Sequence, residues 1–124
     1  MDQWFAVQAS MPGEQSLSRI EALMAHPAFD WTVPNRVRAL VGTLANGNPS
    51  AYHSQAGEGY RLFAAALTRL DGINPQIAAR LANAAARLPK LEAVRREHLA
   101  SALLTVKKQA SDNLREVLER ILEA

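Results

Sequence analysis

The stretch VPNRVRALVGTLANG (residues 33–47) predicts an amphipathic helix with a marked start and a marked end. Pro34 suits the first turn of a helix, where a backbone N–H has no intrahelical partner, and Asn46-Gly47 suits the last turn. The large apolar residues recur every three or four positions, on one face of such a helix: Val37, Leu40, Val41 and Leu44. A helix with one apolar face must pack against other elements, so the stretch favours a helical fold.

The same periodicity recurs on both sides of this stretch, and no segment alternates between apolar and polar residues as a strand does. Further helices are expected within residues 16–26, 57–72, 74–88, 91–109 and 112–124. Asn48-Pro49 and Asn74-Pro75 favour helix starts, because an asparagine side chain caps free N–H groups and proline pre-sets the first turn. Either Ser111 or Asp112 is expected to cap the last helix.

Short connections between successive helices favour antiparallel pairs. The sequence therefore predicts an all-α fold, a HEAT/armadillo-like right-handed superhelical array, although no strict sequence repeat is visible. Residues 1–124 are expected to form a single domain, with residues 1–14 a truncated leading helix and loop. DQWFAVQAS (residues 2–10) is too short for a stable isolated helix. An apolar surface carrying Trp4 and Phe5 would favour self-association.

The composition excludes several classes of protein. Hydrophobic residues make up 48% and charged residues 21%, which is typical of a folded globular chain. The net charge is +2, and Arg95-Arg96 and Lys107-Lys108 are the only basic doublets, so a nucleic-acid partner is not expected. The absence of cysteine excludes disulfides and thiolate metal sites. No apolar run is long enough for a signal peptide or a membrane span, which favours a cytoplasmic protein.

The three histidines do not form a metal-binding pattern. His26, His53 and His98 fall on different expected elements, and the sequence has no HExxH motif. The position where a second ligand would follow Glu97-His98 is taken by Ser101 or Ala102. No metal site is expected in this chain.

The segment NGNPSAYHSQAGEGY (residues 46–60) carries several residue types found in active sites. Gly57 and Gly59 precede a helix, but without a preceding strand or a GK[ST] motif they indicate a turn more than a phosphate site. Ser50, Ser54 and His53 lack an ordered acid partner for nucleophilic catalysis. The segment is interpreted as a connection between helices, with His53 on a short helix, buried and hydrogen-bonded by the loop.

Gln76 and Arg80 are the strongest candidates for a binding site. They are spaced i, i+4, so they share one face at the start of a helix, beside its apolar stripe. Arg36 and Arg38, on the helix of residues 33–47, also differ from ordinary surface charges in their position. Two interpretations stay open: a solvated helix edge, or a polar wall that contacts a ligand.

Two strings together resemble a known family. HPAFDWTVPNRVRALVGTLANGNPSAYHSQAGEGYRLF (residues 26–63) and LDGINPQIAARL (residues 70–81) closely resemble the C-terminal helical domain of bacterial aminopeptidase N, in order and spacing. The resemblance is specific from Arg19 to Leu81 and loose after Leu88. Val33 stands where the family has asparagine, and HSQAGEGY (residues 53–60) lacks the aspartate of the family's glycine turn.

The resemblance implies that the zinc site and the HExxH helix lie in a separate catalytic domain, outside these residues. The chain would then be a non-catalytic C-terminal domain that closes the catalytic cavity and lines the peptide channel. Gln76 and Arg80 match the family's NPQxAxR motif, whose polar side chains face that cavity, and Arg38 is a weaker candidate. The implied partners are the catalytic domain and a peptide substrate.

A second hypothesis is a stand-alone helical-repeat module that binds a peptide or a partner protein on the concave face of its array. An enzyme acting alone has no motif to support it.

Overall fold

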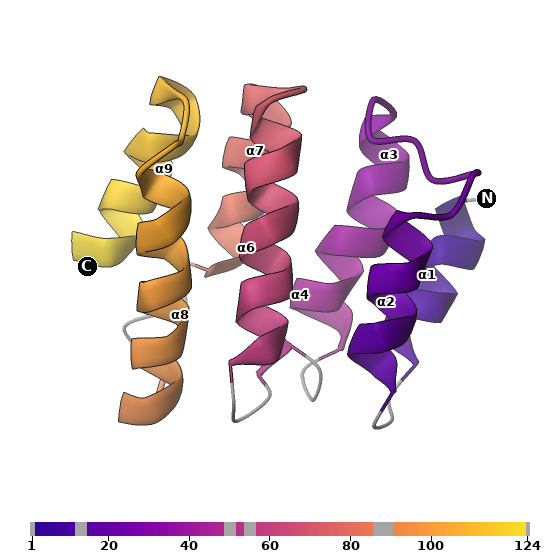
Figure 1. Cartoon of the computed structure of the whole chain (residues 1–124), viewed down its shortest axis with the longest axis horizontal. Helices are drawn as coiled ribbons and strands as arrows, with labels where there is room; N and C mark the ends of the chain where they lie inside the picture. The colour runs from indigo at the N-terminus through magenta and orange to yellow at the C-terminus, as the bar shows by residue number, and fades with distance from the viewer. Residues whose placement is uncertain (1, 12–14, 49–51, 54–56, 86–90, 124) are drawn as a thin grey trace.

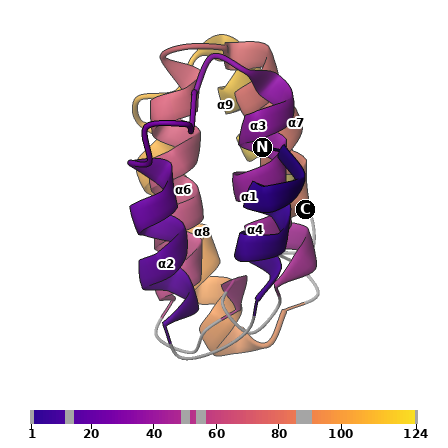
Figure 2. The same ribbon diagram turned by 90° about the vertical axis from the view of Figure 1, so that its right-hand side faces the viewer.

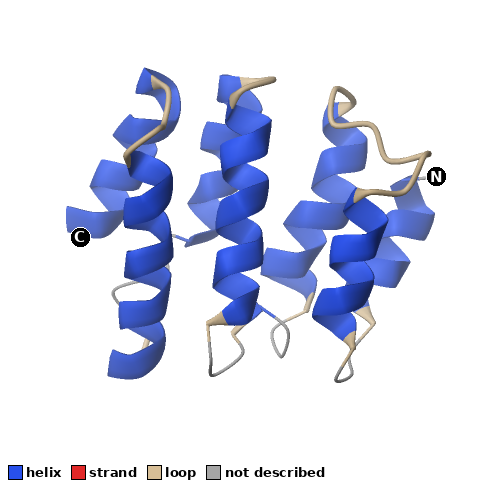
Figure 3. Cartoon of the chain, viewed as in Figure 1, coloured by secondary structure: helices blue, strands red, loops and turns tan. Residues whose placement is uncertain are grey.

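The computed structural model describes residues 2–11, 15–48, 52–53, 57–85 and 91–123 (Figure 1). In these ranges the regular elements are all helical, and Figure 3 shows no strand among them. They are α1 (Asp2–Ser10), α2 (Ser16–Met24), α3 (Pro34–Val37), η1 (Arg38–Gly42), α4 (Thr43–Gly47), α6 (Glu58–Asp71), α7 (Pro75–Ala82), η2 (Asn83–Ala85), α8 (Ala93–Lys107) and α9 (Asp112–Glu123). The prediction of an all-α fold is confirmed.

The helices alternate between two layers. Figure 2 shows α2, α6 and α8 in one layer and α1, α3, α4 and α7 in the other, and α9 packs beside α7. Successive helices run in opposite directions (Figure 1), and each packs against helices one or two places away in the chain, as α6 does against α7 and α8. This is the predicted array of antiparallel helix pairs. None of the described helices is long and apolar enough to cross a bilayer.

The helix predicted from residues 33–47 is formed by α3, η1 and α4 in direct succession. Pro34 occupies the first turn, and the four large apolar residues of the predicted stripe are all buried. The π-helical turn η1 in its middle was not predicted, because the hydrophobic period does not distinguish an inserted residue of this kind. Val33, where the family has asparagine, makes no side-chain cap.

The first helix is held by packing. Phe5 and Ala9 of α1 are fully buried, and α1 lies against η1, α4 and α2. The expectation that Phe5 lies on an exposed surface is wrong, because its ring packs edge-on against Phe29, with centroids 5.3 Å apart. Trp4 and Val7 are 41% and 50% exposed. A helix too short to be stable alone is therefore stabilised by its tertiary contacts.

Among the helices that the structure describes, three begin with a side-chain cap. Asn74 Oδ1 accepts from the backbone N–H of Ile77 at 3.3 Å, as predicted for the start of α7. Of the two candidates at α9, Ser111 is the cap, since its Oγ accepts from the N–H of Leu114. The start of α8 is capped by Glu92, which accepts from two backbone N–H groups and was not predicted.

The Asn48-Pro49 start falls largely on residues 49–51, outside the described part of the chain. The amide nitrogen of Asn48 donates to the carbonyl oxygens of Ala9, at 2.9 Å, and Met11, at 3.2 Å. Asn48 is buried, so these bonds fasten the end of α4 to the end of α1.

Candidate functional site

Gln76 and Arg80 lie on the outward face of α7. Asn74 and Pro75 start this helix, and Ile77 and Ala78 fill the core, which turns residues 76 and 80 outward. Both side chains are exposed, and neither forms a hydrogen bond or ion pair with another described residue. They are therefore not buried scaffold residues, and both a solvated edge and a ligand-binding wall remain compatible with their position.

Arg36 and Arg38 have different environments. Arg36 Nε lies 3.2 Å from Asp2 Oδ1, and its Nη1 donates to the carbonyl of Ala28 at 3.1 Å, so Arg36 joins α1 to α3 and the preceding loop. This contact makes Arg36 a structural residue. Arg38 is exposed, donates to Asn35 Oδ1 at 2.8 Å and lines a cleft that Leu81 of α7 also lines. Neither Gln76 nor Arg80 lines that cleft.

The three histidines are held apart. His26 Nδ1 accepts from the backbone N–H of Ala28 at 3.0 Å. His53 Nδ1 is hydrogen-bonded to the phenol of Tyr60, and His98 lies under Gly57. Within the described ranges no three His, Cys, Asp or Glu side chains are grouped closely enough to hold a metal ion.

The contact of His53 joins three parts of the fold. Arg95 Nε of α8 donates to the carbonyl of His53 at 2.7 Å, while Tyr60 belongs to α6. Burial raises the pKa of the Tyr60 phenol, which keeps the phenol protonated at neutral pH. His53 was expected to be buried and hydrogen-bonded by the loop. Its side chain is half-buried, and this hydrogen bond goes to Tyr60 of the following helix. Ser50 and Ser54 lie outside the described residues.

Gly57 marks the entry into α6. Its φ of +78° lies in the left-handed region, and a Cβ placed there would lie 2.9 Å from His98 Cβ. The residue is thus required by both backbone conformation and close approach to α8. Gly59 lies within α6. The interpretation of this segment as a connection between helices fits these contacts.

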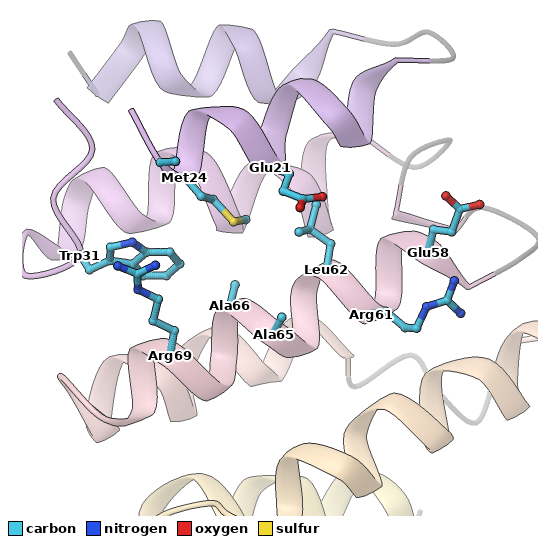
Figure 4. A pocket seen from close by; sticks show the side chains of 10 residues that line it. Glu21, Met24, Trp31, Glu58, Arg61, Leu62, Ala65, Ala66 and Arg69 are labelled. Carbon is cyan, nitrogen blue, oxygen red and sulfur yellow. The ribbon is translucent and has the colours of Figure 1, made fainter. Parts of the chain in front are cut away.

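A larger cleft, which the sequence did not predict, lies between α2 and α6 (Figure 4). Its volume is about 590 Å³, within the size range of small-ligand sites. Its floor is apolar, from Met24, Leu62, Ala65 and Ala66, and Trp31 closes one end. The small side chains at positions 65 and 66 leave room between the helices. The run of three alanines at residues 64–66 was the only signal in the sequence.

Charged side chains surround this floor. Arg69 lies over the ring of Trp31, 4.9 Å from its centroid. Glu58 and Arg61 lie at the other end, with Glu21 on the α2 side (Figure 4). One end of the cleft therefore carries an arginine stacked on an indole ring, and the other carries a glutamate and an arginine.

A two-layer array of antiparallel helices places this chain in the class of armadillo-like helical-repeat domains. The chain belongs to the family described as "Domain of unknown function (DUF3458_C) ARM repeats", whose model matches residues 1–123. The predicted family resemblance is confirmed by its relatives.

The chain is similar to aminopeptidase N of Haemophilus influenzae, at 42% identity over 125 residues, covering 99% of this chain and 14% of that protein. It is similar to aminopeptidase N of Escherichia coli at 39% identity, covering 86% of this chain and 12% of that protein. A crystal structure of Legionella pneumophila aminopeptidase A in complex with aspartic acid matches with a TM-score of 0.93 and 35% identity, over 98% of this chain and 14% of that one. The chain thus spans a small part of the length of these relatives.

Proposed function

We propose that this chain acts as the non-catalytic C-terminal domain of a zinc-dependent aminopeptidase, where it closes the catalytic cavity and lines the peptide channel. The observation that carries the proposal is the exposed pair Gln76 and Arg80 on α7, in a chain homologous to a small part of aminopeptidase N. An exposed amide beside a guanidinium suits peptide carbonyls and carboxylates.

The chemistry of the chain supports a binding role. The sequence carries no HExxH motif, and the described residues hold no candidate metal cluster. In this proposal zinc is held by the catalytic domain, which is the first partner of the chain, and peptide is the second. The proposed location is the cytoplasm.

A second candidate function is a stand-alone peptide-binding module, and the cleft between α2 and α6 is the observation that favours it. The two candidates use different layers of the array, α7 for the first and α2 with α6 for the second.

The test of the first candidate is a chimera in which this chain replaces the matching segment of Escherichia coli aminopeptidase N. We expect Gln76→Ala/Arg80→Ala in the active chimera to raise KM for peptides of four or more residues by about tenfold, the effect of losing one charge-assisted contact. The KM for a single-residue chromogenic substrate should stay unchanged, because that substrate does not reach beyond the scissile bond.

Arg96→Ala is the matched control, since Arg96 is an exposed arginine on α8 in the opposite layer. The proposal is contradicted if KM is equal for the double variant, the control and the parent chimera at every peptide length. Gln76 and Arg80 would then not contact the substrate.

A further inference from the structure

At the Trp31 end of the α2–α6 cleft, the indole N–H of Trp31 is a hydrogen-bond donor with no acceptor among the described residues. Trp31 is 8% exposed, and this N–H is buried. Arg69 beside it stacks on the ring and forms no ion pair with another described residue. Buried donors are nearly always satisfied, and a guanidinium binds carboxylates with paired N–H groups. This end therefore suits an anion, and a carboxylate above all.

The rest of the cleft has the opposite charge. Figure 4 shows Glu58 and Arg61 at the far end and Glu21 between the two ends, so these three side chains together carry one net negative charge. Carboxylates at the rim attract an ammonium group. The cleft is therefore positive at Arg69 and net negative over the part that Glu21 and Glu58 line.

The length of the cleft limits the occupant. Arg61 and Arg69 are eight residues apart on α6, which corresponds to about 12 Å along a helix. An extended peptide advances about 3.3–3.6 Å per residue, so three or four residues span this distance. The apolar floor between the ends, with Met24 and Leu62, suits an aliphatic side chain.

We propose that the α2–α6 cleft binds a short peptide with free termini, its C-terminal carboxylate against Arg69 and its amino group against Glu21 and Glu58. The site lies in the layer opposite to Gln76 and Arg80, and it does not depend on attachment to a catalytic domain. If the cleft does not bind peptide, the proposed channel-lining role of Gln76 and Arg80 still stands. If Gln76 and Arg80 do not line the channel, the cleft can still bind peptide.

The test is a titration of the chain with the tripeptide Ala-Leu-Ala, followed by calorimetry and by the two indole N–H signals in NMR spectra. We expect saturable binding, with a downfield shift of the Trp31 signal and little change at Trp4, which lies on α1 away from the cleft. Conversion of the peptide to its C-terminal amide should weaken binding about tenfold, as expected for one charge-assisted contact.

Variants test which residues of the cleft bind the two termini of the peptide. Arg69→Gln should weaken binding of the free peptide about tenfold and leave the affinity for the amide unchanged. Glu21→Gln/Glu58→Gln should weaken binding of the free peptide but not of its N-acetyl form. Arg96→Gln removes the same charge from an exposed position on α8 that does not line the cleft, and should leave all affinities unchanged.

Three outcomes would overturn the proposal. One is the absence of saturable binding up to about 10 mM, a concentration above the millimolar affinity of a weak site. Another is equal affinity for the acid and the amide. The third is equally tight binding of a blocked peptide with an internal aspartate, which would assign the site to side-chain carboxylates.

Discussion

At the scale of single residues, Asp71 forms a long-range polar link, to a residue 40 positions further along the chain. It is buried at the end of α6, and its Oδ2 accepts from the backbone N–H of Ser111 at 2.7 Å, while Oδ1 accepts from the Ser111 hydroxyl. Asp71→Ala removes both acceptors and leaves a donor unpaired. We expect the free energy of unfolding to fall by about 1–3 kcal/mol, measured by urea denaturation.

Glu116→Ala is the control for Asp71, because Glu116 is an exposed acid on α9. Its effect should stay within about 0.5 kcal/mol. Similar losses for the two variants would mean that the Asp71–Ser111 link contributes little to stability.

Gly57 supplies a second prediction at this scale. Gly57→Ala places a side chain in the left-handed region and against His98, so we expect a loss of at least about 1–2 kcal/mol in the free energy of unfolding. A Cβ at Gly42 would meet Leu81 at 3.6 Å, an ordinary contact. Gly42→Ala should therefore be neutral or stabilise by up to about 1 kcal/mol. Thermal melts of the two variants check this, and a reversed order would contradict it.

At the scale of helices, the start of α7 depends on one side chain. Asn74→Ala should lower the free energy of unfolding by about 1 kcal/mol, the usual effect of losing an N-cap. Asn113→Ala makes the same change in the first turn of α9, at an exposed residue, and should have little effect. Equal shifts in melting temperature would exclude Asn74 as a cap that matters for stability.

The cap at the start of α8 makes the stability of the fold depend on pH. Hydrogen bonds from the backbone N–H groups of Arg95 and Val94 lower the pKa of Glu92 below its ordinary value. The folded state therefore favours the carboxylate, and its contribution to stability is present above the ordinary glutamate pKa and lost as the pH falls through the lower, folded-state pKa.

Glu92→Gln should accordingly melt at a lower temperature than the unchanged chain near neutral pH, and the difference should shrink as the pH falls below the folded-state pKa. Glu97→Gln removes the same charge from the same helix, away from its first turn. Parallel melting curves for the two variants across this pH range would show that Glu92 is not a cap.

Much of this helical framework could be predicted from the sequence, because burial follows the 3.6-residue period in each helix. Asn74 was predictable as a cap because Asn-Pro is a local signal, whereas the role of Asp71 depends on Ser111, 40 residues away. The α2–α6 cleft escaped prediction for the same reason: Trp31 and Arg69 are distant in sequence and meet only in the folded chain. Gln76 and Arg80 were predicted to share a helix face, and their role in binding stays a prediction.

At the scale of the whole molecule, the proposed function places catalysis in a separate domain and therefore predicts that this chain alone has no peptidase activity. The purified 124-residue protein should release no amino acid from peptides and should retain no stoichiometric zinc after dialysis, since the sequence has no HExxH motif. Amino-acid release assays and metal analysis by mass spectrometry check this. Hydrolysis that survives repurification and is abolished by a chelator would contradict it.

The alternation of helices between two layers also affects how the chain reaches its native state. Because each helix packs on helices one or two places away in the chain, folding does not require the two ends of the chain to meet before it can begin. Such arrays fold rapidly and open in sections. Backbone amides at the two ends of the array should therefore exchange with solvent sooner than those of α6, which packs against helices on both sides along the chain.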